Sequence, residues 1–446
     1  MSEPTERCDV LIEAGWVVPV APHGAVLEDH AVAVRGDAIV AIGPAADLRA
    51  RFAAAETVSR PGAALIPGFV NAHTHNPMTL LRGIADDLPL MEWLQGHIWP
   101  VEGAVIGPDF VRDGVTLAIA EMLRGGTTCA NENYFFPDVQ GETYRRYGFR
   151  ALVGLPVIDF PTAWATTADE YFGKAQDVHD ALRGDALVGT AIAPHAPYTV
   201  SDANFERVRD FAHARDVRVH LHTHETAQEV RNSVAQHGMR PLERLDRLGL
   251  VDDRLIAVHM TQLTDEEIAL CAARGVCIAH CPESNLKLAS GFCPVCKLQR
   301  AGVTFGIGTD GCASNNDLDM VGETRTAALL AKAVADDASA LDAASALRAA
   351  TLGGAITLGL GDRIGSIEAG KQADLALVDL DGLESQPIHN VISQLVYATG
   401  RHQVRDVWIA GRRKLRDREL VDMDLPGILA NARQWRGRIA SIRSGA

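Results

Sequence analysis

The chain contains the stretch Pro67-Gly68-Phe69-Val70-Asn71-Ala72-His73-Thr74-His75, an apolar run that ends in two histidines two positions apart. Side chains at positions i and i+2 of an extended strand lie on the same side, so both imidazoles can bind one cation. Consecutive apolar residues fit a strand that is buried on both faces, as in a parallel sheet covered by helices. The stretch predicts the first strand of an α/β fold with a metal site at its carboxyl end.

Seven further apolar runs follow this one, and amphipathic helical segments such as residues 109–123, 203–214 and 264–273 lie between them. The eight expected strands are Leu65–Ala72, Thr127–Asn131, Arg150–Ile158, Leu187–Ala193, Val217–Leu221, Leu255–Val258, Val276–Ala279 and Val303–Ile307. Alternation of strands and helices is typical of βα units around a parallel sheet. Eight such strands favour an α/β fold of the (β/α)8 TIM-barrel type, although periodicity alone also fits a doubly wound open sheet.

Short β-branched runs separated by turn residues occupy both ends of the chain, at residues 8–66 and again at 375–409. Neither end has enough strands for a stable packed sheet, but together they do. We therefore expect a small β-sheet domain built from both chain ends. The expected division is 1–64 for its N-terminal part, 65–364 for the barrel, and 365–446 for its C-terminal part and tail.

The composition limits the class of partner. The chain has 446 residues with 42 Lys plus Arg and 57 Asp plus Glu, a net charge of −15 that argues against nucleic acid or an anionic membrane as partner. Residues 1–9 are polar and no run of 18 apolar residues occurs, so we expect a cytoplasmic protein. Eight cysteines are too few for a disulfide framework in so long a chain, and Cys293 and Cys296 lack the second pair of a zinc knuckle.

Polar residues follow the expected strands at their carboxyl ends, which is where βα barrels build active sites. Besides His73 and His75, these are His195, His222, His259 and Asp310. Three imidazoles and one carboxylate, from His73, His75, His222 and Asp310, suit Zn2+ or Fe2+. Because His220, His222 and His224 share one strand face, spacing alone leaves open which of the three binds metal.

Such a site has the groups for hydrolysis. A metal with an open coordination position lowers the pKa of bound water toward ~7. Asp310 can contact the metal and accept a proton from that water, and Glu225, just beyond the fifth strand, can carry the proton to the substrate. His259 can hydrogen-bond the nucleophile or the developing charge.

One motif points elsewhere. Residues 306–311 satisfy the pattern G-x-G-x-x-G of dinucleotide-binding proteins. The strand comes late in the chain, Asp310 would face the pyrophosphate, and residues 312–317 do not open an obvious helix. We interpret these glycines as spacing residues at a crowded strand end.

The motifs at 67–75, His222-x-x-Glu225, His259 and residues 308–310 resemble the amidohydrolase superfamily, and the resemblance spans nearly the whole chain. Longer strings at residues 78–83, 85–90, 97–102 and 313–317 are similar to the 5-methylthioadenosine/S-adenosylhomocysteine deaminase family. The resemblance implies a distorted (β/α)8 barrel with a small β-sandwich built from both chain ends. It also implies a single divalent metal, with zinc preferred and iron as the alternative, because residues 187–195 contain no lysine that could bridge two ions.

By the same resemblance His73, His75, His222 and Asp310 are the metal ligands, Glu225 is the proton shuttle and His259 is the catalytic histidine of strand six. Glu102 matches a position that hydrogen-bonds the ribose hydroxyls, and His195 matches a histidine that contacts the substrate. Glu225 and Asp310 also contact the substrate in this reading. No arginine is clearly placed to bind the amino-acid tail of S-adenosylhomocysteine, and Arg82, in a loop, is the one candidate.

The implied activity is hydrolytic deamination of the adenine ring of 5′-methylthioadenosine, S-adenosylhomocysteine or adenosine. The alternatives are an aminohydrolase or chlorohydrolase of the same superfamily that acts on guanine, cytosine or an s-triazine, and a scaffold that has lost catalysis. The expected partner is a small nucleoside, and homo-oligomerisation is an expectation from the family.

Overall fold

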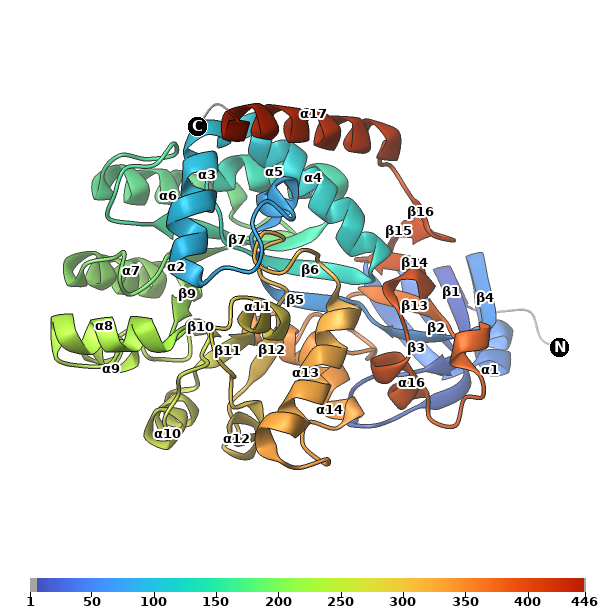
Figure 1. Ribbon diagram of the computed structural model, residues 1–446. Helices are drawn as coiled ribbons and strands as arrows, with labels where there is room; N and C mark the ends of the chain where they lie inside the picture. Colours follow the sequence, from blue (N-terminus) through green and yellow to red (C-terminus); the bar gives the residue numbers. More distant parts are fainter. Residues whose placement is uncertain (1–5, 445–446) are drawn as a thin grey trace.

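The computed structural model describes residues 6–444, which form a closed parallel β-barrel ringed by helices and a separate β-sheet beside it (Figure 1). Residues 1–5 of the polar N-terminal stretch lie outside the described part. The barrel strands are β5 (Phe69–Thr74), β6 (Thr127–Glu132), β7 (Arg150–Val157), β8 (Val188–Pro194), β9 (Val219–Thr223), β10 (Leu255–His259), β11 (Cys277–His280) and β12 (Phe305–Ile307).

Each barrel strand pairs in parallel with the next one in sequence, from β5 to β12. A parallel bridge between Thr74 and Asp310 joins the last strand to the first and closes the ring. The predicted (β/α)8 barrel is therefore confirmed, and the open-sheet alternative is wrong. Seven of the eight strands lie within two residues of their predicted bounds, because continuous apolar runs mark strands that are buried on both faces.

The first predicted strand, Leu65–Ala72, is wrong as one element. Residues 65–67 end a different strand, β4 (Phe52–Pro67), in the second sheet, and the barrel strand begins at Phe69. Gly68 separates the two. A Cβ at this position would lie 2.2 Å from the Thr128 side chain, so the chain passes β6 too closely for any other residue. Both segments are apolar because both are buried, and hydrophobicity alone therefore did not reveal the break.

Helices connect the barrel strands and cover the outside of the barrel (Figure 1). The three helices predicted by range correspond to α4, α7 and α10, each within one residue, and a Thr264–Glu267 capping box opens α10. The helices are α1 (Ala45–Arg51), α2 (Leu90–Trp93), α3 (Trp99–Val105), α4 (Pro108–Arg124), α5 (Pro137–Tyr147), α6 (Ala168–Leu182), α7 (Asp202–Arg215), α8 (Ala227–His237), α9 (Pro241–Arg247), α10 (Asp265–Arg274), α11 (Pro282–Lys287), α12 (Val295–Arg300), α13 (Met320–Ala335), α14 (Ala343–Arg348), α15 (Gly354–Thr357), α16 (Val391–Tyr397) and α17 (Leu425–Ser444).

The second sheet, the terminal sheet, takes four strands from each end of the chain. Its strand order is β16-β15-β14-β13-β4-β1-β2-β3. Its remaining strands are β1 (Glu6–Val17), β2 (Leu27–Arg35), β3 (Ala38–Pro44), β13 (Leu375–Asp379), β14 (Val404–Ile409), β15 (Arg412–Arg416) and β16 (Glu419–Leu420).

The terminal sheet folds over itself as a sandwich does. Val34 and Ile39 from one end of the sheet share an apolar cluster with Trp408 from β14, near the other end. The Ile39 amide donates to the Lys371 carbonyl at 2.8 Å, and Gly411 has φ 72° where a Cβ would lie 2.2 Å from the Gly36 carbonyl oxygen. The predicted domain built from both chain ends is confirmed as a sheet. The division at 64 and 364 stays a prediction.

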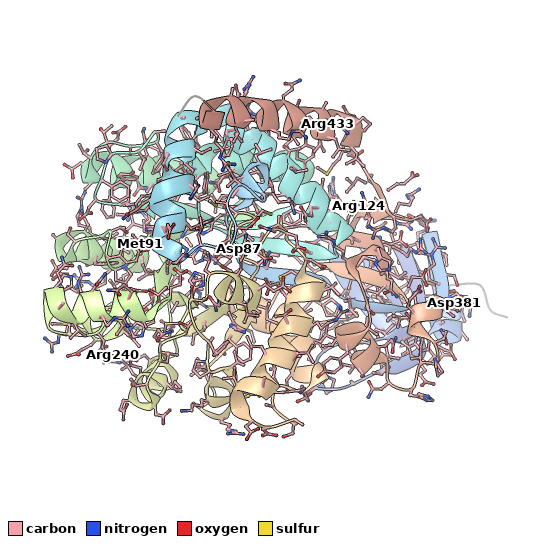
Figure 2. The ribbon with its side chains drawn as sticks, viewed as in Figure 1. Asp87, Met91, Arg124, Arg240, Asp381 and Arg433 are labelled. Atoms are coloured by element: carbon pink, nitrogen blue, oxygen red, sulfur yellow. The ribbon has the colours of Figure 1, made fainter. Side chains whose placement is uncertain are left out.

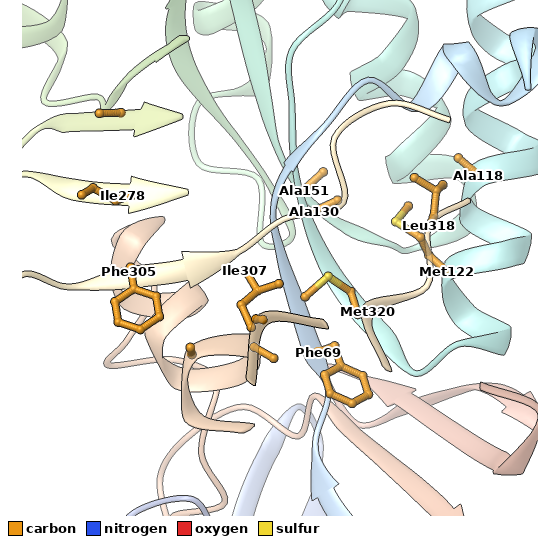
Figure 3. Close-up of a cluster of buried hydrophobic side chains, with 14 of the residues drawn as sticks. Phe69, Ala118, Met122, Ala130, Ala151, Ile278, Phe305, Ile307, Leu318 and Met320 are labelled. Atoms are coloured by element: carbon orange, nitrogen blue, oxygen red, sulfur yellow. The ribbon is translucent and has the colours of Figure 1, made fainter. Parts of the chain in front are cut away.

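Apolar side chains fill the space where the first and last barrel strands meet the surrounding helices. Figure 3 shows Phe69, Ile307 and Met320 close together there, with Met122 of α4 beside them, and all four belong to one buried cluster. The C-terminal helix α17 also packs on the barrel, since Trp435 lies edge-to-face on Phe110 of α4 and its Nε1 donates to Asp113 at 2.8 Å. The C-terminal helix therefore covers the barrel, although the strands just before it in the chain, β13 to β16, belong to the terminal sheet.

A buried ion pair joins the two sheets. Arg150 of β7 donates to both oxygens of Asp374, just before β13, from Nε at 2.7 Å and Nη2 at 3.0 Å. Both side chains are about 1% exposed, and Asp374 also accepts from the Ala410 amide.

Among residues 6–444, no helix is long and apolar enough to cross a membrane.

We predict that Arg150→Met destabilises the protein by about 3–5 kcal/mol, because removal of one partner leaves a carboxylate buried without its counter-charge. The midpoint of urea unfolding measures the change. Arg145→Met is the matched control: Arg145 pairs with Asp185 at a half-exposed site, and its loss should cost less than ~1 kcal/mol. Equal midpoints for the two variants would contradict a structural role of the buried pair.

Candidate metal centre and active site

The carboxyl ends of four barrel strands bring their polar residues to one point. His73 and His75 lie on β5, His222 on β9 and His259 at the end of β10, and Asp310 follows β12. Nitrogen and oxygen atoms of these residues fall into two overlapping groups within 4.8 Å, one of His73, His75 and Asp310 and one of His73, His222 and His259. The convergence expected from the strand ends is therefore present.

The ring nitrogens face one another at the centre of this cluster. Asp310 Oδ1 lies 3.2 Å from Nε2 of both His73 and His75, and His222 Nε2 lies 3.3 Å from His75 Nε2. His73 Nε2 is fully buried and has no hydrogen-bond partner. Three imidazole nitrogens and one carboxylate oxygen directed at a common point are the donor set that Zn2+ and Fe2+ prefer. The residues present therefore fit a divalent metal.

Each of these histidines is oriented by a contact at its other ring nitrogen. His73 Nδ1 lies 2.8 Å from His220 Nε2, and His222 Nδ1 lies 2.6 Å from the His195 carbonyl oxygen. His75 Nδ1 makes a short contact with the Asn133 carbonyl oxygen. Such partners fix the ring and leave Nε2 free as a ligand, as is usual at protein metal sites.

Asp310 has partners on both carboxylate oxygens. Oδ2 accepts from the hydroxyls of Ser284 at 2.7 Å and Ser314 at 2.8 Å, and Oδ1 accepts from the Gly311 amide at 2.8 Å. Burial opposes ionisation, but the contacts with His73 and His75 hold the pKa of Asp310 well below its usual value. Sequence reasoning missed Ser284 and Ser314. The position of Ser284 soon after the seventh strand was the signal that could have found it.

The three histidines of β9 have separate environments, which distinguishes them where spacing could not. Only His222 belongs to the cluster of ring nitrogens. His220 lies behind His73, and the Nε2 of His224 accepts from the Leu242 amide at 3.0 Å, on the side of Arg240 and Glu267. His224 and His220 are thus occupied by other contacts.

Glu225 lies beside His259, a member of the second group. His259 Nε2 is 3.9 Å from Glu225 Oε2, and His259 Nδ1 is 2.9 Å from Asn285 Oδ1. The backbone amide of Glu225 donates to Glu229 at 2.7 Å, which fixes the turn after β9. Burial raises the pKa of Glu225 above its usual value. A buried carboxyl group that takes up protons more readily than usual is suited to proton transfer.

A cavity of about 530 Å3 opens above these residues, and His75, His222, Glu225, His259 and Asp310 line its floor. Glu102 from α3 and His195 after β8 also line it, so seven of the eight predicted site residues line one cavity. The eighth, His73, is fully buried next to Asp310 and does not line the cavity. Glu102 is 8% exposed, and burial raises its pKa to about 7 while the Tyr134 hydroxyl donates to it. His195 lies 3.0 Å from the Thr199 hydroxyl, and burial lowers the pKa of His195 to about 4.

Two sequence features that point to other chemistry have structural explanations. The glycines at 306 and 308 are places of close approach: a Cβ would lie 2.7 Å from Gly354 Cα and 2.7 Å from the His73 amide nitrogen, respectively. Cys293 and Cys296 are buried free thiols. Tyr134 is a site residue that sequence reasoning missed, and its place two residues after β6 was the available signal.

Comparisons with known proteins agree with this geometry. A family model described as the amidohydrolase family matches residues 64–414. A Teredinibacter turnerae protein named 5-methylthioadenosine/S-adenosylhomocysteine deaminase is 46% identical over 98% of this chain and 99% of its own length. A protein of the same name from Saccharophagus degradans is 43% identical over 98% of both.

Solved structures extend the likeness to the fold. The crystal structure of an adenosine deaminase from Xanthomonas campestris with bound zinc superposes with a TM-score of 0.98, at 73% identity over 98% of this chain and 100% of that one. A mutant atrazine chlorohydrolase from Arthrobacter aurescens, complexed with zinc and atraton, superposes with a TM-score of 0.88 at 26% identity, over 96% of this chain and 99% of that one.

We predict that His222→Asn lowers the affinity for zinc by more than about 100-fold, since even loss of an outer partner of a ligand costs 10–100-fold. Metal analysis of dialysed protein in zinc buffers measures the change. His213→Asn is the control, because His213 is half-exposed and pairs with Asp252. Full zinc retention by a folded His222→Asn variant would exclude His222 as a ligand.

Proposed function

The chain belongs to the amidohydrolase family, and we propose that it hydrolytically deaminates the adenine ring of 5′-methylthioadenosine, S-adenosylhomocysteine or adenosine. The observation that carries this proposal is the cavity itself. It combines a cluster of metal-binding donors and a buried Glu225 on its floor with a second buried carboxyl group, Glu102, in its wall. The metal-binding donors and Glu225 serve hydrolysis, and Glu102 suits the hydroxyls of a ribose.

We propose that a single divalent ion, zinc in preference to iron, binds to His73, His75, His222 and Asp310. The donor set supports this ligand set, as does the Nε2 of His73, which is buried next to Asp310 and makes no hydrogen bond. The strand β8 contains no lysine that could bridge a second ion. Such an ion supplies a water activated for attack at neutral pH.

The residues around the ion divide the proton transfers. In the overall reaction water adds to C6 of adenine, the amino group leaves as ammonia, and the product carries a hypoxanthine ring. Asp310 accepts a proton from the water, and Glu225 delivers a proton to the ring nitrogen next to C6. His259 Nε2 lies 3.9 Å from Glu225 Oε2. In this proposal His259 hydrogen-bonds the attacking oxygen and stabilises the charge that develops as it adds to C6.

Glu102 holds the ribose in this proposal. An ionised carboxylate only accepts hydrogen bonds, and a ribose diol offers two donors to it. Glu102 is held in place by the Tyr134 hydroxyl, and Tyr134 lies beside His75 with the ring centroids 6.4 Å apart. His195 faces the same cavity and contacts the substrate.

The alternatives share the floor of the cavity and differ in its wall. A guanine, cytosine or triazine substrate has no ribose, so it offers Glu102 no diol to bind. The scaffold alternative has no support, because every expected ligand position carries a metal-binding residue.

The eight cysteines are buried free thiols, which fits the cytoplasmic location that we propose. A homo-oligomer is part of the same proposal.

The first test measures ammonia release by the zinc-loaded chain from 5′-methylthioadenosine, S-adenosylhomocysteine and adenosine, with guanine and cytosine alongside. We predict turnover of the nucleosides, and a loss of at least about 100-fold in Glu225→Gln, because general acid–base groups contribute 10²–10⁴-fold. Zinc content and thermal stability of this variant should match the parent. Near-normal turnover by Glu225→Gln would remove Glu225 from the mechanism, and turnover of the free bases alone would overturn the nucleoside assignment.

The role of Glu102 has its own test. We predict that Glu102→Gln lowers kcat/KM for adenosine by about 10- to 100-fold, since a hydrogen bond to a charged group contributes about 1.5–3 kcal/mol. The matched substrate is 2′,3′-dideoxyadenosine, which lacks the diol. The kcat/KM for adenosine divided by that for 2′,3′-dideoxyadenosine should be lower in Glu102→Gln than in the parent. An unchanged ratio would contradict a contact between Glu102 and the ribose.

A further inference from the structure

The part of the cavity that adjoins Glu102 is apolar. Trp99, Glu102 and Ile106 are spaced by three and four residues along α3 and its end, so they lie on one helix face. All three line the cavity, together with Trp93 before them and Phe160 after β7. Trp99 and Ile106 lie one turn from Glu102 on either side, so a ribose bound at Glu102 has apolar side chains beside it.

Aromatic rings form the outer boundary of this region. The ring centroids of Trp99 and Phe160 are 6.4 Å apart with a 59° angle between the ring planes. Asp87 precedes α2 and Met91 lies within it, both labelled in Figure 2, and the chain continues directly into η2 (Leu94–Ile98). Trp93 of α2 and Leu94 of η2 reach the cavity. A thioether packs favourably on aromatic edges and buries its methyl group there.

The same region lacks a cation. Within residues 6–444, none of the side chains that line the cavity belongs to a lysine or an arginine. The unpartnered donors in the lining, Trp93 Nε1 and Asn133 Nδ2, are neutral. Its histidines, His75, His195, His222 and His259, all lie at the metal end of the cavity.

Three cations on neighbouring segments are committed to partners in the protein. Arg82, the sequence-based candidate for the tail, donates to Glu121 and to the Asn316 carbonyl oxygen at 2.6 Å and does not line the cavity. Lys287 pairs with Asp86 at 2.6 Å. Arg244, in the small pocket next to Tyr198, donates to Asp202 and to two backbone carbonyl oxygens. None of the three is free to bind a carboxylate.

From this wall we propose that the site selects adenosines with an apolar 5′-thioether and discriminates against the zwitterionic amino-acid tail of S-adenosylhomocysteine. The inference rests on the proposed function and narrows its substrate class. Trp99 and Phe160 are the specificity-determining residues. A carboxylate in this wall would lose its hydration without gaining a counter-charge, whereas a methylthio group gains burial. Adenosine, with a neutral hydroxyl at this position, ranks between the two.

The test compares kcat/KM of the zinc-loaded full chain for 5′-methylthioadenosine, 5′-butylthioadenosine and S-adenosylhomocysteine. The butyl compound has a tail of similar length without charges, so it separates length from charge. We expect the two alkylthio compounds to agree within about threefold and S-adenosylhomocysteine to be at least about tenfold poorer, the range that one misplaced group produces in an apolar pocket.

Each other outcome has a definite reading. Equal values for S-adenosylhomocysteine and 5′-methylthioadenosine would overturn the inference and leave the deaminase assignment intact. Equally poor values for the butyl compound and S-adenosylhomocysteine would overturn charge as the basis of selection. No deamination of any adenosine derivative would instead overturn the proposed function.

A pair of variants tests the wall directly. Ala163 is exposed and lines the outer cavity, so Ala163→Arg brings a cation to the rim and Ala163→Met brings similar bulk without charge. We expect Ala163→Arg to raise kcat/KM for S-adenosylhomocysteine relative to 5′-methylthioadenosine by about tenfold, as a charge pair of modest strength provides, and Ala163→Met to leave the ratio within twofold. The same ratio in both variants would contradict the missing cation as the cause.

Discussion

The hydrogen bond from the Asp310 amide to the His73 carbonyl oxygen, at 3.0 Å, is the contact on which the rest of the site depends. It lies beside the bridge that closes the barrel between its first and last strands. Closure brings the two histidines of β5 to the carboxylate after β12, although the intervening chain makes six other strands. A barrel left open at this seam would separate the donors of the metal centre.

The same closure concentrates imidazoles in a buried space. Burial lowers the pKa of His73 to about 4, while the Asp310 carboxylate counteracts burial and raises the pKa of His75 to about 9. His222 Nε2 and His75 Nε2 lie 3.3 Å apart, where two ring nitrogens can share one proton or bind one cation. A metal that binds the folded state and not the unfolded chain stabilises the barrel by its free energy of binding. Stability and catalysis therefore share one set of residues.

The sequence predicted the parts that repeat along the chain and missed those that depend on contacts between distant segments. Apolar strands buried on both faces carry a strong local signal, and the residues at their ends identified His73, His75, His222, His259 and Asp310 as a group. The break at Gly68 was invisible, because residues on both sides of it are buried for different reasons. Ser284, Ser314 and Tyr134 were missed, since the one signal for a lone hydroxyl is a place soon after a strand, which many other polar loop residues share.

The origin of the terminal sheet from both chain ends has a consequence during synthesis. The central strand β4 pairs with β1 on one side and with β13 on the other. When β4 leaves the ribosome, the residues of β13 have not been made, and at roughly 5–20 residues per second they follow only after some tens of seconds. Throughout that interval β4 has an unpaired edge next to an apolar face, a state that invites association with other chains. The nascent chain is then most exposed to misassembly and to chaperones that bind extended apolar segments.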